Sequence, residues 1–186
     1  DLIEGRSVLR VLAAAGLRPL LLDWGEPGRA EAGFGLADYG EARLLPALEA
    51  VRRLAGRDPA VLGYCMGGTL AVGLAARAQG ITALATLGAP WDFTSVRGVA
   101  GTLRAMIRAE GPARTEGLIA AMGQALGMVP VSVFQMLFAM VNPINAALKF
   151  QKLARLDPDG AAARLFVALE DWLAEGVPMP AGAARD

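Results

Sequence analysis

The chain has 186 residues, enough for one substantial hydrophobic core, and its 18 basic and 18 acidic residues give a formal charge of zero. Because no block of lysine and arginine stands out, nucleic-acid binding has no electrostatic support. Although 54% of the residues are hydrophobic, no apolar run reaches the length of a bilayer span, and the start shows no charged-then-apolar signal pattern. The single cysteine excludes an internal disulfide and favours a reducing, cytoplasmic compartment.

The first predicted elements are a surface helix and a buried strand. Apolar residues recur at helical spacing from Ser7 to a stop at Gly16. The apolar run 20–22 predicts a buried parallel strand. The glycine- and proline-rich residues 24–34 then predict a loop at the carboxyl end of that strand, the side where α/β sheets place ligands.

A second helix is predicted ahead of the central motif. Asp38 and Glu41 have the spacing of a capping box, and one apolar helical face follows them as far as Gly56. Pro46 lies inside this pattern, where proline removes a backbone hydrogen bond. We therefore expect a kink or a late helix start at that residue.

The stretch 61–70 has the pattern of a nucleophile elbow, a sharp corner between a strand and a helix. A strand-like apolar run precedes Cys65 and an alanine-rich helical pattern follows it. Gly63 and Gly67 flank the thiol at G-x-C-x-G spacing, where small residues let the backbones pass. Cys65 in the usual serine position predicts a nucleophile that forms a thioester, with the main-chain N–H of Met66 as oxyanion donor. The alternative is a small, inert, buried cysteine, which the strand-and-helix context disfavours.

After the elbow, the pattern changes from alternating strands and helices to helices alone. Residues 81–87 predict a further strand, and the alternation up to this point implies a parallel sheet with helices on both faces. After Asp92, which we interpret as a structural cap, helical patches follow with breaks at glycine and proline. We expect an α/β fold with three parts: a core over 1–92, a helical cap over 93–158, and a return helix with a truncated tail over 159–186.

Two features of the helical part have simple structural explanations. Glu170 and Asp171 are adjacent on a predicted helix and point in different directions, so a solvated face explains them better than acid–base chemistry. Five of the seven methionines lie between Met106 and Met140. Core packing is the simplest explanation, with a lid over an acyl chain or a dimer face as alternatives.

Four stretches together resemble a known protein family. In chain order they are Leu-Leu-Asp-Trp-Gly at 21–25, Gly-Tyr-Cys-Met-Gly-Gly at 63–68, Ala-Pro-Trp-Asp-Phe at 89–93 and Phe-Val-Ala-Leu-Glu-Asp-Trp-Leu at 166–173. This set resembles the polyhydroxyalkanoate synthase family of the α/β-hydrolase superfamily. The resemblance implies a partial α/β-hydrolase fold with a helical cap insertion. It also implies an acyltransferase of poly-3-hydroxybutyrate biosynthesis, in which Cys65 accepts a hydroxyacyl group from coenzyme A and passes it to a growing polyester.

The same resemblance implies the partners. They are a hydroxyacyl-coenzyme A substrate, a polyester product and a second copy in a homodimer, with a cytoplasmic location at polymer inclusions. Neither the residues nor the resemblance indicates a cofactor, a metal, a nucleic acid or a membrane span.

The sequence contains no histidine. In α/β-hydrolases the nucleophile is followed by an acid and then by the histidine base, so we expect the triad partners beyond Asp186 and the chain to be an internal fragment or an incomplete paralogue. A thioesterase or esterase on the same scaffold is one alternative. A non-catalytic interaction subunit on a degenerate hydrolase fold is another. An aspartate and a histidine encoded further on would favour an enzyme, and a stop codon would favour the interaction subunit.

Overall fold

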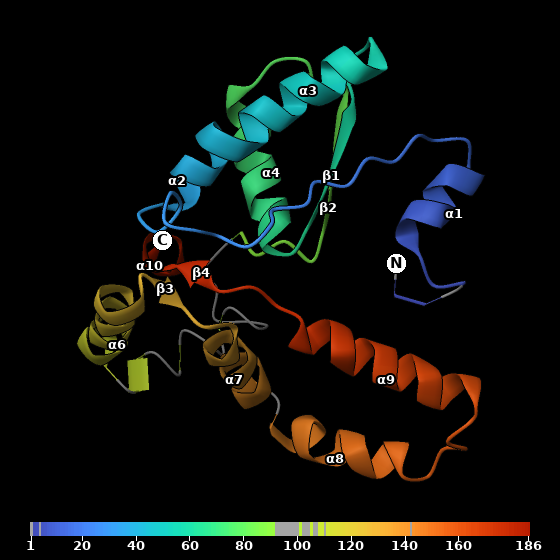
Figure 1. Ribbon diagram of the computed structural model, residues 1–186, viewed down its shortest axis with the longest axis vertical. Coiled ribbons are helices and arrows are strands. Elements are labelled where there is room, and N and C mark those ends of the chain that lie inside the picture. Colours follow the sequence, from blue (N-terminus) through green and yellow to red (C-terminus); the bar gives the residue numbers. More distant parts are fainter. Residues whose placement is uncertain are drawn as a thin grey trace. The chain divides into compact units, whose positions relative to one another are not determined.

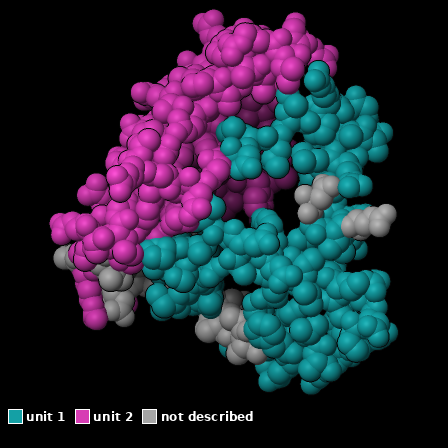
Figure 2. All heavy atoms as spheres, viewed as in Figure 1, with its two compact units in different colours: residues 1–23, 130–177 teal, residues 24–129, 178–186 magenta. Residues whose placement is uncertain are grey.

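The computed structural model describes residues 2–3, 5–91, 101, 105, 108–109, 111–141 and 143–186. They form two compact units, which we describe separately (Figure 2). Unit 1 combines Asp1–Asp23 with Pro130–Val177, and unit 2 combines Trp24–Val129 with Pro178–Asp186. Asp92, Leu103, Met106 and Ile107 lie outside the described residues. The predicted division into core, cap and return helix stays a prediction.

Unit 2 contains a small parallel sheet with one helix packed on it. Strands β1 and β2 pair in parallel, from Ala60 opposite Ala83 to Tyr64 opposite Leu87. Helix α4 connects the strands and lies against both (Figure 1). The elements of this part are α2 (Leu36–Tyr39), η1 (Gly40–Leu44), α3 (Leu45–Ala55), β1 (Ala60–Tyr64), α4 (Met66–Arg77) and β2 (Ala83–Leu87). A mixed helix-and-strand fold with a parallel sheet is thereby confirmed.

The sheet differs from the expected one in two respects. The run 20–22 is not a strand, because residues 17–28 have no regular structure and Leu21 is 74% exposed. A strand needs a neighbour to satisfy its backbone groups, and none is described beside this run in unit 1. All five residues of β2 are exposed, so the described helices do not cover both faces of the sheet as expected.

One helical segment leads into β1 from residue 36 to residue 55. It starts earlier than the predicted Asp38, because Asp38 accepts a hydrogen bond from the main-chain N–H of Gly35 at 2.7 Å and caps the first turn. The disturbance expected at Pro46 takes the form of the π-helical turn η1, which widens the backbone just before the proline. The helix ends at Gly56 as predicted, with φ at 66°.

The rest of unit 2 joins the last residues of the chain to a helix and a loop. It comprises α6 (Pro112–Leu126), β3 (Met128–Val129), β4 (Met179–Pro180) and α10 (Ala181–Arg185). β3 and β4 pair in antiparallel fashion, and Val129 is only 1% exposed. The main-chain N–H of Ala183 donates to the carbonyl of Phe34 at 2.9 Å, and the N–H of Leu36 donates to the carboxylate of Asp186 at 2.8 Å. The loop ahead of α2 is therefore held by the chain end.

Unit 1 is helical. Its elements are α1 (Val8–Ala14), α7 (Val131–Val141), α8 (Pro143–Leu153) and α9 (Ala161–Ala174). Lys149 of α8 donates to the carboxylate of Glu170 on α9 at 2.5 Å, and Gln135 of α7 donates to the Leu173 carbonyl at 2.7 Å. Helices α7, α8 and α9 confirm the helical patches that the sequence predicts in this part of the chain. No described helix has both the length and the hydropathy that a membrane crossing requires.

Candidate active site

Cys65 lies at the corner where β1 ends and α4 begins. Its φ is 52° and its ψ is −127°. Among the described residues, no other non-glycine residue has a positive φ. Such a conformation costs on the order of 1–3 kcal/mol and persists only where surrounding contacts impose it. The predicted sequence of strand, sharp turn and helix is confirmed. The role of the thiol as nucleophile stays a prediction.

Two main-chain hydrogen bonds hold the backbone of Cys65. Its N–H donates to the carbonyl of Leu87 at 2.9 Å, which extends the β1–β2 pairing by one residue. Its carbonyl accepts from the N–H of Gly68 at 2.8 Å. Because both peptide groups of the turn are engaged, the strained conformation is supported by the sheet on one side and by the helix on the other.

The thiol of Cys65 is free and only partly buried. Cys65 is the N-cap of α4, which has 12 residues. A helix N-terminus carries unpaired N–H groups and a partial positive charge, so it stabilises an anion by about 0.3–1 kcal/mol. The position therefore suits a sulfur that passes through a thiolate.

Met66 follows Cys65 directly as the first residue of α4. The residue is 39% exposed. The first N–H groups of a helix have no acceptor within their own helix, so the main-chain N–H of Met66 is free of the α4 ladder. Its assignment as an oxyanion donor stays a prediction.

The close approach of β1 and α4 depends on two glycines. A Cβ at Gly63 would lie 2.5 Å from the Cα of Gly68 and 2.6 Å from the carbonyl oxygen of Gly67. A Cβ at Gly68 would lie 2.5 Å from the Cβ of Ala89. At Gly67 a Cβ would meet no atom within 4 Å, so the steric need expected there lies at Gly68 instead.

Sequence reasoning missed both Gly68 and Thr69. The hydroxyl of Thr69 donates to the carbonyl of Pro90 at 2.6 Å, and so links the first turn of α4 to the loop after β2. The doubled glycine after Met66 was a visible signal for the first residue. No sequence signal identified the hydrogen bond, because its partners lie 21 residues apart.

The loop over 24–34 is confirmed, and an aromatic cluster orders it. The ring of Tyr39 meets the rings of Trp24 and Phe34 edge-on, with centroids 5.6 and 5.4 Å apart. The guanidinium of Arg43 lies over the Phe34 ring, 5.6 Å from its centroid. Burial raises the pKa of Tyr39, and the nearby negative charge of Glu31 raises it further.

Glu31 stabilises the same loop through a hydrogen bond and an ion pair. Its carboxylate accepts a hydrogen bond from the main-chain N–H of Gly28 at 2.8 Å and forms an ion pair with Arg43. The Gly28 hydrogen bond is the largest cause that lowers the pKa of Glu31, and the charge of Arg43 acts in the same direction. The residues of this cluster order the loop, and none of them belongs to the elbow stretch 61–70.

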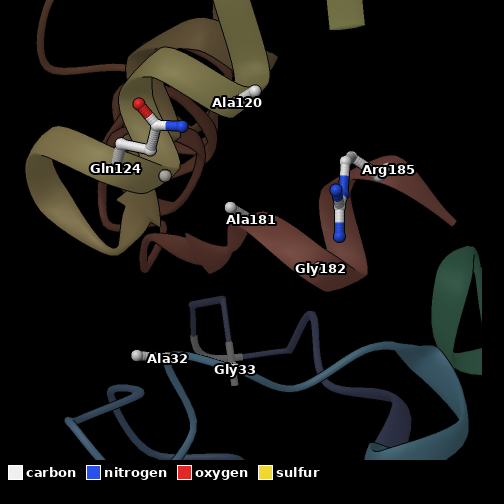
Figure 3. A pocket seen from close by; sticks show the side chains of 8 residues that line it. Ala32, Gly33, Ala120, Gln124, Ala181, Gly182 and Arg185 are labelled. Atoms are coloured by element: carbon white, nitrogen blue, oxygen red, sulfur yellow. The ribbon is translucent and has the colours of Figure 1, made fainter.

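A pocket of about 270 Å³ lies elsewhere in unit 2 (Figure 3). Its polar side chains belong to Gln124 of α6 and Arg185 of α10. The remaining lining residues are Ala32, Gly33, Ala120, Gly123, Ala181 and Gly182. Since none of the elbow residues lines it, the pocket is separate from Cys65. The described residues hold no group of three or more histidine, cysteine, aspartate or glutamate side chains suited to a metal ion.

The sequence is similar to curated polymerases over nearly its whole length. It is 30% identical over 180 residues to the poly(3-hydroxyalkanoate) polymerase subunit PhaC of Haloarcula marismortui, which is 95% of this chain and 36% of that protein. The PhaC subunit of Haloferax mediterranei is also 30% identical over 180 residues, 95% of this chain and 35% of the relative. The PhaC subunit of Synechocystis is 31% identical over 183 residues, 93% of this chain and 46% of the relative.

The chain is homologous to part of a PhaC polymerase subunit. The resemblance to the polyhydroxyalkanoate synthase family is thereby confirmed. The chain spans between 35% and 46% of the length of these three relatives. No family model matches it, and no solved structure matches it significantly.

Proposed function

We propose that this chain carries the acyl-accepting elbow of a polyhydroxyalkanoate synthase. Cys65 takes a hydroxyacyl group from a coenzyme A thioester and passes it to the end of a growing polyester. The observation that carries the proposal is the positive-φ conformation of Cys65 at the start of α4. The similarity to PhaC polymerase subunits over 95% of the chain supports the choice of substrate and product.

The proposed reaction has two acyl-transfer steps. First, the thiolate of Cys65 attacks the thioester carbonyl, a bond forms between that carbon and the cysteine sulfur, and the bond to the coenzyme A sulfur breaks. Coenzyme A leaves as a thiolate and takes up a proton. Second, the terminal hydroxyl of the polyester attacks the Cys65 thioester, and the sulfur leaves with the hydroxyl proton. The polyester is then one unit longer and the thiol is free again.

Two groups assist these steps. The main-chain N–H of Met66 donates to the oxyanion that develops at the carbonyl oxygen in each step. A base must take the proton of the Cys65 thiol, because the thiolate rather than the thiol is the nucleophile. The sequence contains no histidine, so a histidine base has to come from outside these 186 residues.

The proposal extends to the fold and to the setting of the protein. The parallel unit of β1, α4 and β2 with a strained residue at its corner is compatible with part of an α/β-hydrolase fold. We place the core over 1–92, the helical cap over 93–158 and the return helix over 159–186. We also propose that the protein forms a homodimer and is located at cytoplasmic polymer inclusions.

The test measures acylation of Cys65 directly. The purified chain is incubated with 3-hydroxybutyryl-coenzyme A, with and without added imidazole as a substitute base, and its intact mass is recorded. We expect one hydroxybutyryl adduct that forms faster with imidazole and does not form on the Cys65→Ala variant. A folded chain that gains no adduct under either condition would overturn the acyl-accepting role.

The fate of the adduct separates the alternatives. Transfer to an added hydroxyacyl oligomer supports the synthase, whereas release of free hydroxy acid with no polymer supports a thioesterase. The missing histidine favours the third candidate, a non-catalytic interaction subunit, which predicts no adduct at all. An aspartate and a histidine encoded after residue 186 would argue against that candidate.

A further inference from the structure

The turn at Cys65 with the start of α4 is joined at two points to the end of β2 and the loop that follows it. The N–H of Cys65 donates to the carbonyl of Leu87 at 2.9 Å. The hydroxyl of Thr69 donates to the carbonyl of Pro90 at 2.6 Å. The two bonds are four residues apart on one segment and three on the other, so the segments 65–69 and 87–90 are fastened at both ends.

Between these two bonds the segments touch at Gly68 and Ala89, whereas a Cβ at Gly67 or Gly88 would meet no atom within 4 Å. An added Cβ at Gly68 would lie 2.5 Å from the Cβ of Ala89. The loop begins at Gly88, whose φ of 57° turns the chain as it leaves β2. The loop therefore rests directly on the helical turn that follows Cys65.

The Thr69–Pro90 bond has less support from its surroundings than the Cys65–Leu87 bond. The Cys65–Leu87 bond extends the β1–β2 ladder and is supported by the pairing of the whole sheet. The Thr69–Pro90 bond depends on one hydroxyl, which is partly buried. Without that hydroxyl, the Pro90 carbonyl loses its donor and the start of α4 is free to move relative to the loop.

We propose that Thr69 is a positioning residue that holds the strained turn at Cys65 in the orientation needed for acyl transfer. Through the Pro90 carbonyl it fixes the first turn of α4, and with it the relation between the sulfur of Cys65 and the main-chain N–H of Met66. The inference rests on the proposed acyl-accepting function of the elbow. In this role the Thr69 side chain holds the position of the turn and takes no direct part in the acyl transfer.

Two reactions of the single cysteine distinguish positioning from simple exposure. Acylation by p-nitrophenyl acetate develops an oxyanion, so its rate depends on the geometry of the thiol and the Met66 N–H. Alkylation by iodoacetamide occurs at a saturated carbon and develops no oxyanion. Because the chain has one cysteine, the part of each reaction that is lost in the Cys65→Ala variant reports on Cys65 alone. Neither requires a hydroxyacyl substrate or polymer, so this test can fail or succeed independently of the proposed synthase activity.

The informative variants are Thr69→Val, Thr69→Ala and Thr69→Ser. We expect the valine and alanine variants to acylate about tenfold more slowly while their alkylation rates change less than about twofold. The serine variant, which keeps the donor, should recover most of the acylation rate. Thr82→Val, at the other end of β2, is the matched control and should leave both rates unchanged. Either hydroxyl-free variant that folds is sufficient for the comparison.

Three outcomes would overturn the inference. One is an unchanged acylation rate in a folded variant without the hydroxyl. The second is an equal loss of acylation and alkylation that follows the unfolding temperature. The third is a serine variant no faster than the valine variant.

Discussion

A Cβ added to Gly63 would lie 2.5 Å from the Cα of Gly68. Strand β1 and helix α4 therefore approach each other as backbones, with no side chain between them. The contact brings together Gly63, two residues before Cys65, and Gly68, the third residue of α4. The tight corner at Cys65 is possible because both positions lack a side chain.

This relationship predicts a sharp contrast between two glycine substitutions. Gly63→Ala should destabilise the protein by about 1–3 kcal/mol, because backbone atoms have to move to admit the methyl group. Gly67→Ala should be neutral or stabilise by up to about 1 kcal/mol, since the site is open and alanine favours a helix. Urea unfolding followed by circular dichroism measures both. Equal effects of the two substitutions would contradict the described approach of β1 and α4.

The strain at Cys65 predicts that glycine is the better replacement there. Cys65→Gly and Cys65→Ala both remove the thiol and both should abolish adduct formation. Because φ is 52° at this position, the glycine variant should be the more stable of the two by about 1 kcal/mol. Thermal unfolding of the matched pair provides the measurement. An alanine variant as stable as the glycine variant would mean that the corner is not strained.

The loop held by Glu31 predicts a dependence of stability on pH. The pKa of Glu31 is lowered from 4.5 in the folded chain, so its contribution is present above about pH 4.5 and is lost as pH falls through the folded value. Glu31→Gln should therefore destabilise the protein at neutral pH and have a smaller effect near pH 3. Unfolding in urea at several pH values tests this. A difference between variant and wild type that does not change with pH would contradict it.

The ion pair between Lys149 and Glu170 predicts a structural role for the acid. Its side chains are 35% and 27% exposed, so a double-mutant cycle should give a coupling of about 0.5–1 kcal/mol that decreases with added salt. Glu170→Gln should leave the acylation rate of Cys65 unchanged, and Asp171→Asn is the neighbouring control. A large loss of acylation in the Glu170 variant alone would assign that residue to the chemistry.

Local patterns predicted the elements that depend on neighbours in the chain. The strand before Cys65, the helix after it and the stop at Gly56 follow from periodicity and from glycine, which act over a few residues. The same reasoning was wrong for 20–22, where an apolar run has no regular structure. A strand is defined by hydrogen bonds to another strand, and sequence alone did not say whether a neighbour lies beside that run.

The candidate nucleophile was determined by the sequence itself, because one cysteine stands between two glycines in a strand-to-helix pattern. The tertiary structure decided how that corner is held. Gly68 rather than Gly67 provides the close packing, and Thr69 reaches the carbonyl of Pro90. These contacts exist because β1 and β2 pair in register, which brings residues about twenty positions apart into contact. The sequence spacing of these residues does not show that they lie close together in the folded chain.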